Sequence, residues 1–183
     1  METTSLITQY LGDAARLGEV VRSGGDWSGS SPCAGWSAAD VLDHVITTER
    51  DFLALHGAAT GPTPAGAPTE RWEAHLRLLR SVLTEELVTR CFEGWFGPTT
   101  VGATLQEFYG WDLLVHRWDL GRALGQEVRL SEEELDRIER YVPRPGDPKH
   151  EVFYSDGICA SPVEAPPAAT RQQRVLATLG RSA

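Results

Sequence analysis

Apolar residues recur along most of the chain at intervals of three and four positions, the spacing that places them on one face of an α-helix. Four long segments show this pattern: residues 3–22, 38–56, 69–90 and 104–124. Two shorter segments repeat it, at residues 132–142 and 171–179. The sequence therefore predicts four long amphipathic helices followed by two short ones.

Local signals mark where several of these helices begin and end. Ser37 is a residue type that caps helix N-termini, and Asp40 places a carboxylate in the first turn, where the helix dipole favours it. Ser131 repeats the capping signal ahead of the first short helix, and Gly125 is a C-cap signal after the fourth long one.

The connections between the helices differ in length and composition. Residues 57–68 are rich in Gly, Ala and Pro and predict a linker, and residues 91–103 predict a long loop or a short irregular strand. Residues 143–167 predict irregular chain with a short strand at 152–154. Because alternating strand and helix units are absent, we predict an all-α fold: a single domain over residues 1–183, built as an up-down-up-down four-helix bundle with short C-terminal helices and an irregular tail.

The fourth long helix carries two polar residues on its apolar stripe. Asp112 and His116 take positions where Leu or Val is typical, and a buried carboxylate needs a cation, a proton or several hydrogen-bond donors. A spacing of four residues places both heads on one helix face, as for the two histidines of a metalloprotease helix. The pair can therefore share one metal ion.

A third ligand must come from another helix, and His44 is our candidate. It lies among apolar neighbours in the segment 38–56. Helical bundles build metal sites from side chains that project inward from facing helices. Two imidazoles and one carboxylate suit zinc with an open fourth position, and iron and nickel accept similar ligands.

The same three residues also have a purely structural interpretation. Asp112 and His116 can form a buried ion pair, and His44 can be a core histidine bonded to a backbone carbonyl. On spacing alone this interpretation is the more common one, because single polar residues on helix stripes are frequent.

Composition narrows the classes of function. The 183 residues are 41% hydrophobic and 23% charged, as in ordinary globular proteins. A net charge of −9 argues against non-specific binding to nucleic acid or to an anionic membrane. The chain has three cysteines without a CxxC pair, no signal-peptide pattern and no apolar run near the roughly 20 residues of a membrane span, so we expect a cytoplasmic protein. One lysine beside sixteen arginines indicates a GC-rich, actinobacterial type of source.

Three segments together resemble a known family. Residues 31–45, SPCAGWSAADVLDHV, are similar to the signature PCxGW(S/T)xxDLLxHV of the mycothiol-dependent maleylpyruvate isomerase N-terminal domain group, within the DinB-like superfamily. Residues 111–125, WDLLVHRWDLGRALG, resemble that group's segment (D/E)xLVHxWDLARAxG. Residues 157–164 and 173–181 are similar to the closing segment of single-domain members often described only as metal-binding proteins.

The resemblance implies a four-helix bundle whose metal ligands are a histidine on the second helix and a carboxylate and a histidine on the fourth. On this chain those positions are His44, Asp112 and His116. It also implies a metal cavity that activates a thiol, mycothiol in actinobacteria, for isomerisation or S-transfer. The isomerase carries a further C-terminal domain that helps complete its active site, and this chain is too short to hold one, so we do not expect the maleylpyruvate substrate to carry over.

Two charged residues near the predicted ligands have alternative roles. Asp119, three residues after His116, can orient that imidazole from outside the ligand set or pair with Arg122 on the same helix. Arg122 can instead hold a carboxylate of a substrate or cofactor, and we take it as the candidate cofactor-binding residue.

For the remaining candidates we predict ordinary structural roles. Trp36 is expected to pack across the entrance of the second helix, and Cys33 to serve packing because it has no clear base partner. His56, His75 and His150 have no partner at a useful spacing and are predicted to lie at the surface.

Three functional hypotheses follow. The first is a metal-dependent enzyme acting on a small molecule, in which the ion activates a thiol or water for transfer, isomerisation or hydrolysis. The second is a metal-binding or sensing module without turnover. The third is a structural bundle whose polar trio is internally satisfied and whose surface serves self-association, for example as a homodimer.

Overall fold

The computed structural model describes residues 3–95, 97–155 and 158–182, and most of them are helical, which confirms the all-α class. In chain order the elements are α1 (Thr3–Ser23), α2 (Ala38–Leu55), α3 (Pro68–Val82), α4 (Glu85–Val88), β1 (Cys91–Gly94), β2 (Gly97–Thr100), α5 (Val101–Thr104), the π-helical turn η1 (Leu105–Tyr109), α6 (Gly110–Ala123), α7 (Glu132–Tyr141), α8 (Pro148–Ser155) and α9 (Arg171–Thr178). Residues 156–157, inside the segment predicted to be irregular, lie outside the described residues.

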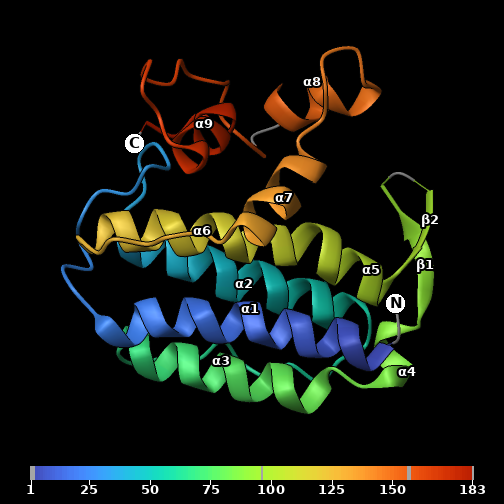
Figure 1. Ribbon diagram of the computed structural model, residues 1–183. Coiled ribbons are helices and arrows are strands. Elements are labelled where there is room, and N and C mark those ends of the chain that lie inside the picture. The colour runs from blue at the N-terminus through green and yellow to red at the C-terminus, as the bar shows by residue number, and fades with distance from the viewer. Residues whose placement is uncertain (1–2, 96, 156–157, 183) are drawn as a thin grey trace.

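The four long helices α1, α2, α3 and α6 lie side by side around the larger hydrophobic core (Figure 1). Two ion pairs give the relative direction of α2 and α3: Asp43 with Arg71 at 2.5 Å, and Glu49 with His75 at 2.6 Å. Because both partners advance together along the chain, α2 and α3 run in the same direction. The predicted up-down-up-down order is therefore wrong, and the helices run up-down-down-up.

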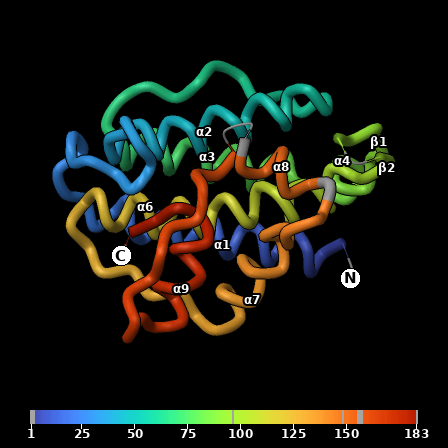
Figure 2. The backbone as a smooth tube through the Cα atoms, turned by 90° about the horizontal axis from the view of Figure 1, so that it is seen from above, coloured from blue at the N-terminus to red at the C-terminus, as the bar shows by residue number. Residues whose placement is uncertain are grey.

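The linker between α2 and α3 explains this order. The 18 residues of α2 span about 27 Å, whereas the twelve residues that follow can reach up to about 40 Å when extended. Figure 2 shows this segment returning beside α2. Arg50 in α2 fastens it there, since its guanidinium donates to the carbonyls of Thr60, Gly61 and Pro62. The linker is thus long enough to cross the bundle, and α3 starts again at the end where α2 began.

The boundaries of the third and fourth long helices differ from the prediction. The helix expected at 69–90 stops at Val82, and Thr84 caps the separate turn α4 by accepting a hydrogen bond from the backbone N–H of Leu87 at 3.2 Å. The helix expected at 104–124 begins earlier, with Thr100 as the N-cap of α5. It continues through η1 into α6, so a π turn directly precedes the segment that carries the candidate ligands.

Two short segments changed type. The loop or irregular strand expected at 91–103 contains the antiparallel hairpin of β1 and β2. Residues 152–154, predicted as a strand, lie inside helix α8. The prediction failed because a run of three apolar residues is too short to distinguish the period of a helix from that of a strand. The Phe153 ring meets Trp111 of α6 edge-on at 5.7 Å, so the apolar side of α8 packs on a helix rather than in a sheet.

Helix α6 lies between two hydrophobic clusters and is buried on nearly every side. Leu113 and Leu120 face the core shared with α1, α2 and α3, whereas Trp111 and Trp118 face a second cluster formed with α7 and α9. Figures 1 and 2 show α7, α8 and α9 on the side of α6 away from α3. Within the described ranges, no helix is long and apolar enough to cross a membrane.

Candidate metal centre

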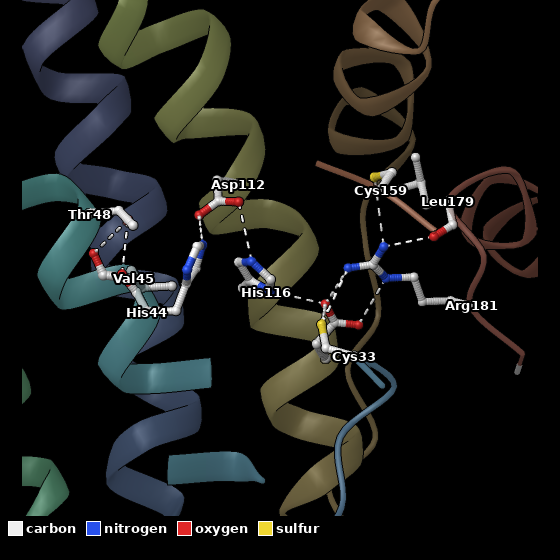
Figure 3. Close-up of polar contacts among 10 residues, drawn as sticks. Cys33, His44, Val45, Thr48, Asp112, His116, Cys159, Leu179 and Arg181 are labelled. Carbon is white, nitrogen blue, oxygen red and sulfur yellow. Dashed lines mark hydrogen bonds and ion pairs between the residues drawn. The ribbon is translucent and has the colours of Figure 1, made fainter. Parts of the chain in front are cut away.

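His44, Asp112 and His116 come together between α2 and α6 (Figure 3). The Nε2 atom of His116 lies 3.2 Å from Oδ1 of Asp112, and Nε2 of His44 lies 3.7 Å from Oδ2 of the same carboxylate. One donor atom from each residue lies within 4.8 Å of the other two. The structure therefore brings together the three residues predicted as ligands, while metal binding by them stays a prediction.

The start of α2 fixes the helical position of His44. Ser37 and Asp40 form a capping box: the Ser37 hydroxyl accepts a hydrogen bond from the N–H of Asp40 at 3.3 Å, and the Asp40 carboxylate accepts one from the N–H of Ser37 at 2.8 Å. This confirms the predicted cap. It sets the helical phase so that His44, about two turns after Ser37, faces α6.

Trp36 lies against both histidines of the trio. Its ring centroid is 4.9 Å from that of His44 and 6.1 Å from that of His116, the latter at an interplanar angle of 26°. The indole therefore covers the two imidazoles on one side. Packing at the entrance of α2 was the predicted role, and the structure adds that the surfaces it packs against are the candidate ligands.

Solvent reaches the trio on the His44 side, whereas Asp112 and His116 are largely buried. The side chain of His44 is 31% exposed, against 13% for Asp112 and 8% for His116. A cleft of about 430 Å³ adjoins His44, lined also by Gly35, Trp36, Asp40, Asp43, Thr47 and Thr48. A small molecule can therefore approach the trio from the His44 side.

The two imidazoles differ in their preference for a proton. Burial lowers the pKa of His44, an effect that His116 reinforces and Asp112 opposes. Burial also disfavours the charged form of His116, but Asp112 and Asp119 outweigh it and raise the pKa of His116 well above its usual value. At neutral pH His44 thus keeps a lone pair for a cation. A proton on His116 meanwhile balances the carboxylates beside it.

Asp119 holds the other nitrogen of the His116 ring. Its Oδ2 atom accepts from Nδ1 of His116 at 3.0 Å and from the guanidinium of Arg181 at 2.9 Å. Burial alone would raise the pKa of the Asp119 carboxyl, but these two partners outweigh it and lower the pKa to about 2. Asp119 therefore orients His116 with Nε2 toward Asp112, one of the two roles that the sequence left open.

The low pKa of Asp119 predicts a specific loss of stability in acid. A carboxyl with a pKa of about 2 in the folded protein and about 3.9 when unfolded stabilises the fold above pH 4 and loses that contribution as the pH falls through 2. We expect urea unfolding of metal-free protein to lose roughly 2 kcal/mol from this group between pH 5 and pH 2. The Asp119→Asn variant should lack this part of the pH dependence, and an unchanged dependence would contradict the assignment.

Comparison with known proteins assigns the chain to a family. Residues 8–121, more than half of the chain, match the family described as mycothiol maleylpyruvate isomerase N-terminal domain. The chain belongs to this family. No curated protein and no solved structure matches it. The family membership expected from the motifs is thereby confirmed.

The matched family domain contains the whole trio together with Cys33 and Asp119. It ends at Gly121, inside α6, so the helices α7, α8 and α9 lie beyond it. Most residues of the second hydrophobic cluster therefore lie outside the matched family domain, and so does Arg181.

Arg122, also just outside the matched family domain, does not join the trio. Six helical positions after His116, it points to another face of α6, where its guanidinium lies over the Trp118 ring at 5.8 Å from the centroid. It is exposed and lines a separate cavity of about 710 Å³ against α9. Asp119 pairs with His116 and Arg181 instead of Arg122, whereas the predicted role of Arg122 in holding a carboxylate of a substrate or cofactor stays a prediction.

Cys33, predicted to serve packing, belongs instead to a polar network beside the trio. Its Sγ atom lies 3.4 Å from Oδ2 of Asp119 and 3.5 Å from the guanidinium of Arg181. The same guanidinium lies 3.8 Å from Sγ of Cys159 (Figure 3). Periodicity gave no signal for this network, because its members come from a loop, from α6 and from the tail. The family resemblance of residues 173–181 covered Arg181 without assigning it a role.

Two of the three thiols, those of Cys91 and Cys159, are predicted to differ in reactivity. Burial raises the pKa of Cys159 to about 11 despite the nearby Arg181, whereas Cys91 is exposed. A rise of about two units lowers the thiolate fraction roughly 100-fold. In the native protein at pH 8, iodoacetamide should therefore alkylate Cys91 roughly 100-fold faster than Cys159, as peptide mass spectrometry would measure. Equal rates in the folded protein would contradict this, and equal rates in urea serve as the control.

A second polar pair lies deeper in the family domain. His75, predicted to lie at the surface, is fully buried, and its Nε2 atom lies 2.6 Å from Oε2 of the buried Glu49. The sequence did hold a signal for this: His75 lies three positions after Trp72 and four before Leu79, on the buried stripe of α3. Burial, followed by the charge of Glu49, also raises the pKa of Tyr10 well above its usual value. Glu49 therefore belongs to the interior of the bundle and does not line the cleft beside His44.

Proposed function

We propose that this family member binds one divalent metal ion through His44, Asp112 and His116 and acts with a thiol, mycothiol by the family's description, as a transferase or isomerase on a small molecule. One observation carries the proposal: three donor side chains from two helices converge within 4.8 Å beside an open cleft.

The donor set suits a reactive metal ion. Two imidazole nitrogens and one carboxylate are typical of catalytic zinc, with a position left for water or another ligand, and iron or nickel accept the same donors. His44 keeps its lone pair at neutral pH, and Asp119 holds Nδ1 of His116, so Nε2 of His116 is the nitrogen that would release its proton when the ion binds. When bound, the ion would supply a positive charge that lowers the pKa of a thiol or water in the open position.

The chain's own residues define how a co-substrate reaches this centre. Trp36 packs against both imidazole rings and forms one wall of the cleft beside His44, from which a co-substrate would approach. Two threonines, Thr47 and Thr48, line that cleft and place hydroxyl-bearing side chains near the path of a polar ligand. We further propose that residues 1–183 form one DinB-like bundle domain, because both hydrophobic clusters share α6.

Metal content tests the first half of the proposal. Protein purified without added metal should contain about one ion per chain by elemental analysis, with zinc expected. The His44→Ala variant should lose it. His56→Ala is the matched control, because His56 ends the same helix but packs against Phe52 and Phe92 instead of the trio. Wild-type protein without metal after reconstitution would overturn the proposal.

A thiol titration tests the second half. Cobalt-substituted protein should change its visible spectrum on addition of mycothiol or a surrogate thiol, because a thiolate in the open position alters the ligand field. No spectral change in protein that holds one cobalt per chain would favour the alternative, a metal-binding or sensing module without turnover.

A further inference from the structure

We propose that Arg181 is a positioning residue of the metal centre, acting through Asp119 on the ligand His116. The inference rests on the proposed function, since it assigns a role to Arg181 in metal binding. Arg181 in the tail is hydrogen-bonded to Asp119, and Asp119 to His116. Figure 3 labels Arg181 and His116, the two ends of this chain of contacts.

Arg181 holds Asp119 with two parallel bonds. Its Nη2 atom lies 2.9 Å from Oδ2, and its Nε atom lies 3.2 Å from Oδ1. A third bond, from Nη1 to the carbonyl of Leu179 at 2.7 Å, ties the guanidinium to its own backbone. Both side chains are buried, at 7% and 0% exposure. A buried bidentate pair of this kind allows the carboxylate little freedom to rotate.

The position of the Asp119 carboxylate matters because the same oxygen binds both partners. Oδ2 accepts from Arg181 and from Nδ1 of His116, so the direction of the imidazole ring depends on where Arg181 places that oxygen. Without the guanidinium, Asp119 would be a buried carboxylate that can satisfy itself by taking a proton or turning toward Cys33. Outer partners of metal-bound histidines usually change metal affinity 10- to 100-fold when removed.

The backbone turn at Gly180 determines the position of Arg181. The N–H of Gly180 bonds to the carbonyl of Ala177 and the N–H of Arg181 to that of Leu176, both at 3.1 Å, which is a Schellman ending of α9. Gly180 has φ of +77°, and a Cβ atom there would lie 2.6 Å from the Cβ of Ala160. Only glycine fits this turn, which directs the chain and the Arg181 side chain back toward α6.

Arg181 lies sixty residues beyond the end of the matched family domain. The metal centre of this chain would therefore depend on its tail as well as on the family domain. Binding linkage adds a reciprocal expectation: an ion that favours the ordered His116 also favours the docked tail.

Metal affinity in matched variants tests the proposal. Cobalt or zinc dissociation constants, measured by chelator competition, should rise about 10-fold or more in Arg181→Ala. The dissociation constant of Arg181→Lys should lie between those of Arg181→Ala and the wild type, because lysine keeps the charge but loses the bidentate geometry. The control is Arg171→Ala: Arg171 fastens the same helix α9 to Glu132, Asp136 and Glu139 of α7 without touching Asp119.

A double-mutant cycle separates positioning from tail docking. In an Asp119→Asn background, Arg181→Ala should cause no further loss of affinity. Hydrogen exchange adds a second measure: metal should protect residues 171–182 in the wild type and not in Asp119→Asn. If Arg181→Ala fails to fold, Arg181→Lys and Asp119→Asn carry the comparison.

The outcomes are distinguishable. Native affinity and a native cobalt spectrum in Arg181→Ala, or an equal loss in Arg171→Ala, would overturn the role of Arg181 while leaving the metal centre intact. Wild-type protein that binds no cobalt would overturn the metal centre itself.

Discussion

Replacing His116 with alanine is expected to weaken metal binding by more than about 100-fold, beyond the range seen for residues that only support a ligand. His116 is the most connected member of the trio: Nε2 faces Asp112 at 3.2 Å and Nδ1 faces Asp119 at 3.0 Å. Its loss removes a donor and leaves two buried carboxylates without the group between them. Elemental analysis and chelator competition would measure the effect.

Replacing His44 with alanine is expected to have a smaller effect on folding stability than replacing His116. His44 is four times as exposed and contacts Asp112 at 3.7 Å, so water can replace it more readily and His44→Ala should lose less folding stability than His116→Ala. His150→Ala serves as the neutral control, because its ring packs on Tyr154 of α8. Retention of a full metal content in His116→Ala would assign the ion to other donors.

Two members of the trio could be predicted together because their signal is local. Asp112 and His116 are one turn apart on one helix, so their common face follows from helical geometry alone. The link to His44 needed the family motif, since no rule of spacing relates residues on different helices. The cap at Ser37 was likewise a local signal, and the structure confirms it.

The features that the sequence did not predict depend on chain direction and long-range packing. A linker of twelve residues permits α3 to run either way, and the observed direction decides that His75 meets Glu49 inside the bundle. Arg181 reaches Asp119 across 62 positions, through a tail whose path depends on packing against the far side of α6. Amphipathic periodicity describes one face of a helix and therefore missed the second face of α6, which is also buried.

The buried pair of Glu49 and His75 leads to the largest expected effect on folding stability. Replacing His75 with leucine keeps a side chain of similar size but leaves the Glu49 carboxyl group in the core without its hydrogen-bond partner at 2.6 Å. A buried hydrogen-bonding group left without its partner typically costs about 1–3 kcal/mol, and more when the group is charged. Urea denaturation should show this loss, whereas Arg129→Ala, which breaks an exposed pair with Glu127, should cost no more than about 1 kcal/mol.

A double variant tests whether the stranded carboxylate is the cause. If Glu49→Leu is combined with His75→Leu, no unpartnered carboxyl group remains at this position, and most of the lost stability should return, since apolar replacement of a whole buried pair is often nearly neutral. If the double variant is as unstable as His75→Leu, packing of the imidazole against Trp72, at 5.4 Å between ring centroids, would be the cause instead. Either single variant should keep native metal affinity in its folded fraction, because neither residue belongs to the trio. A changed affinity would show that the interior pair and the metal centre are coupled.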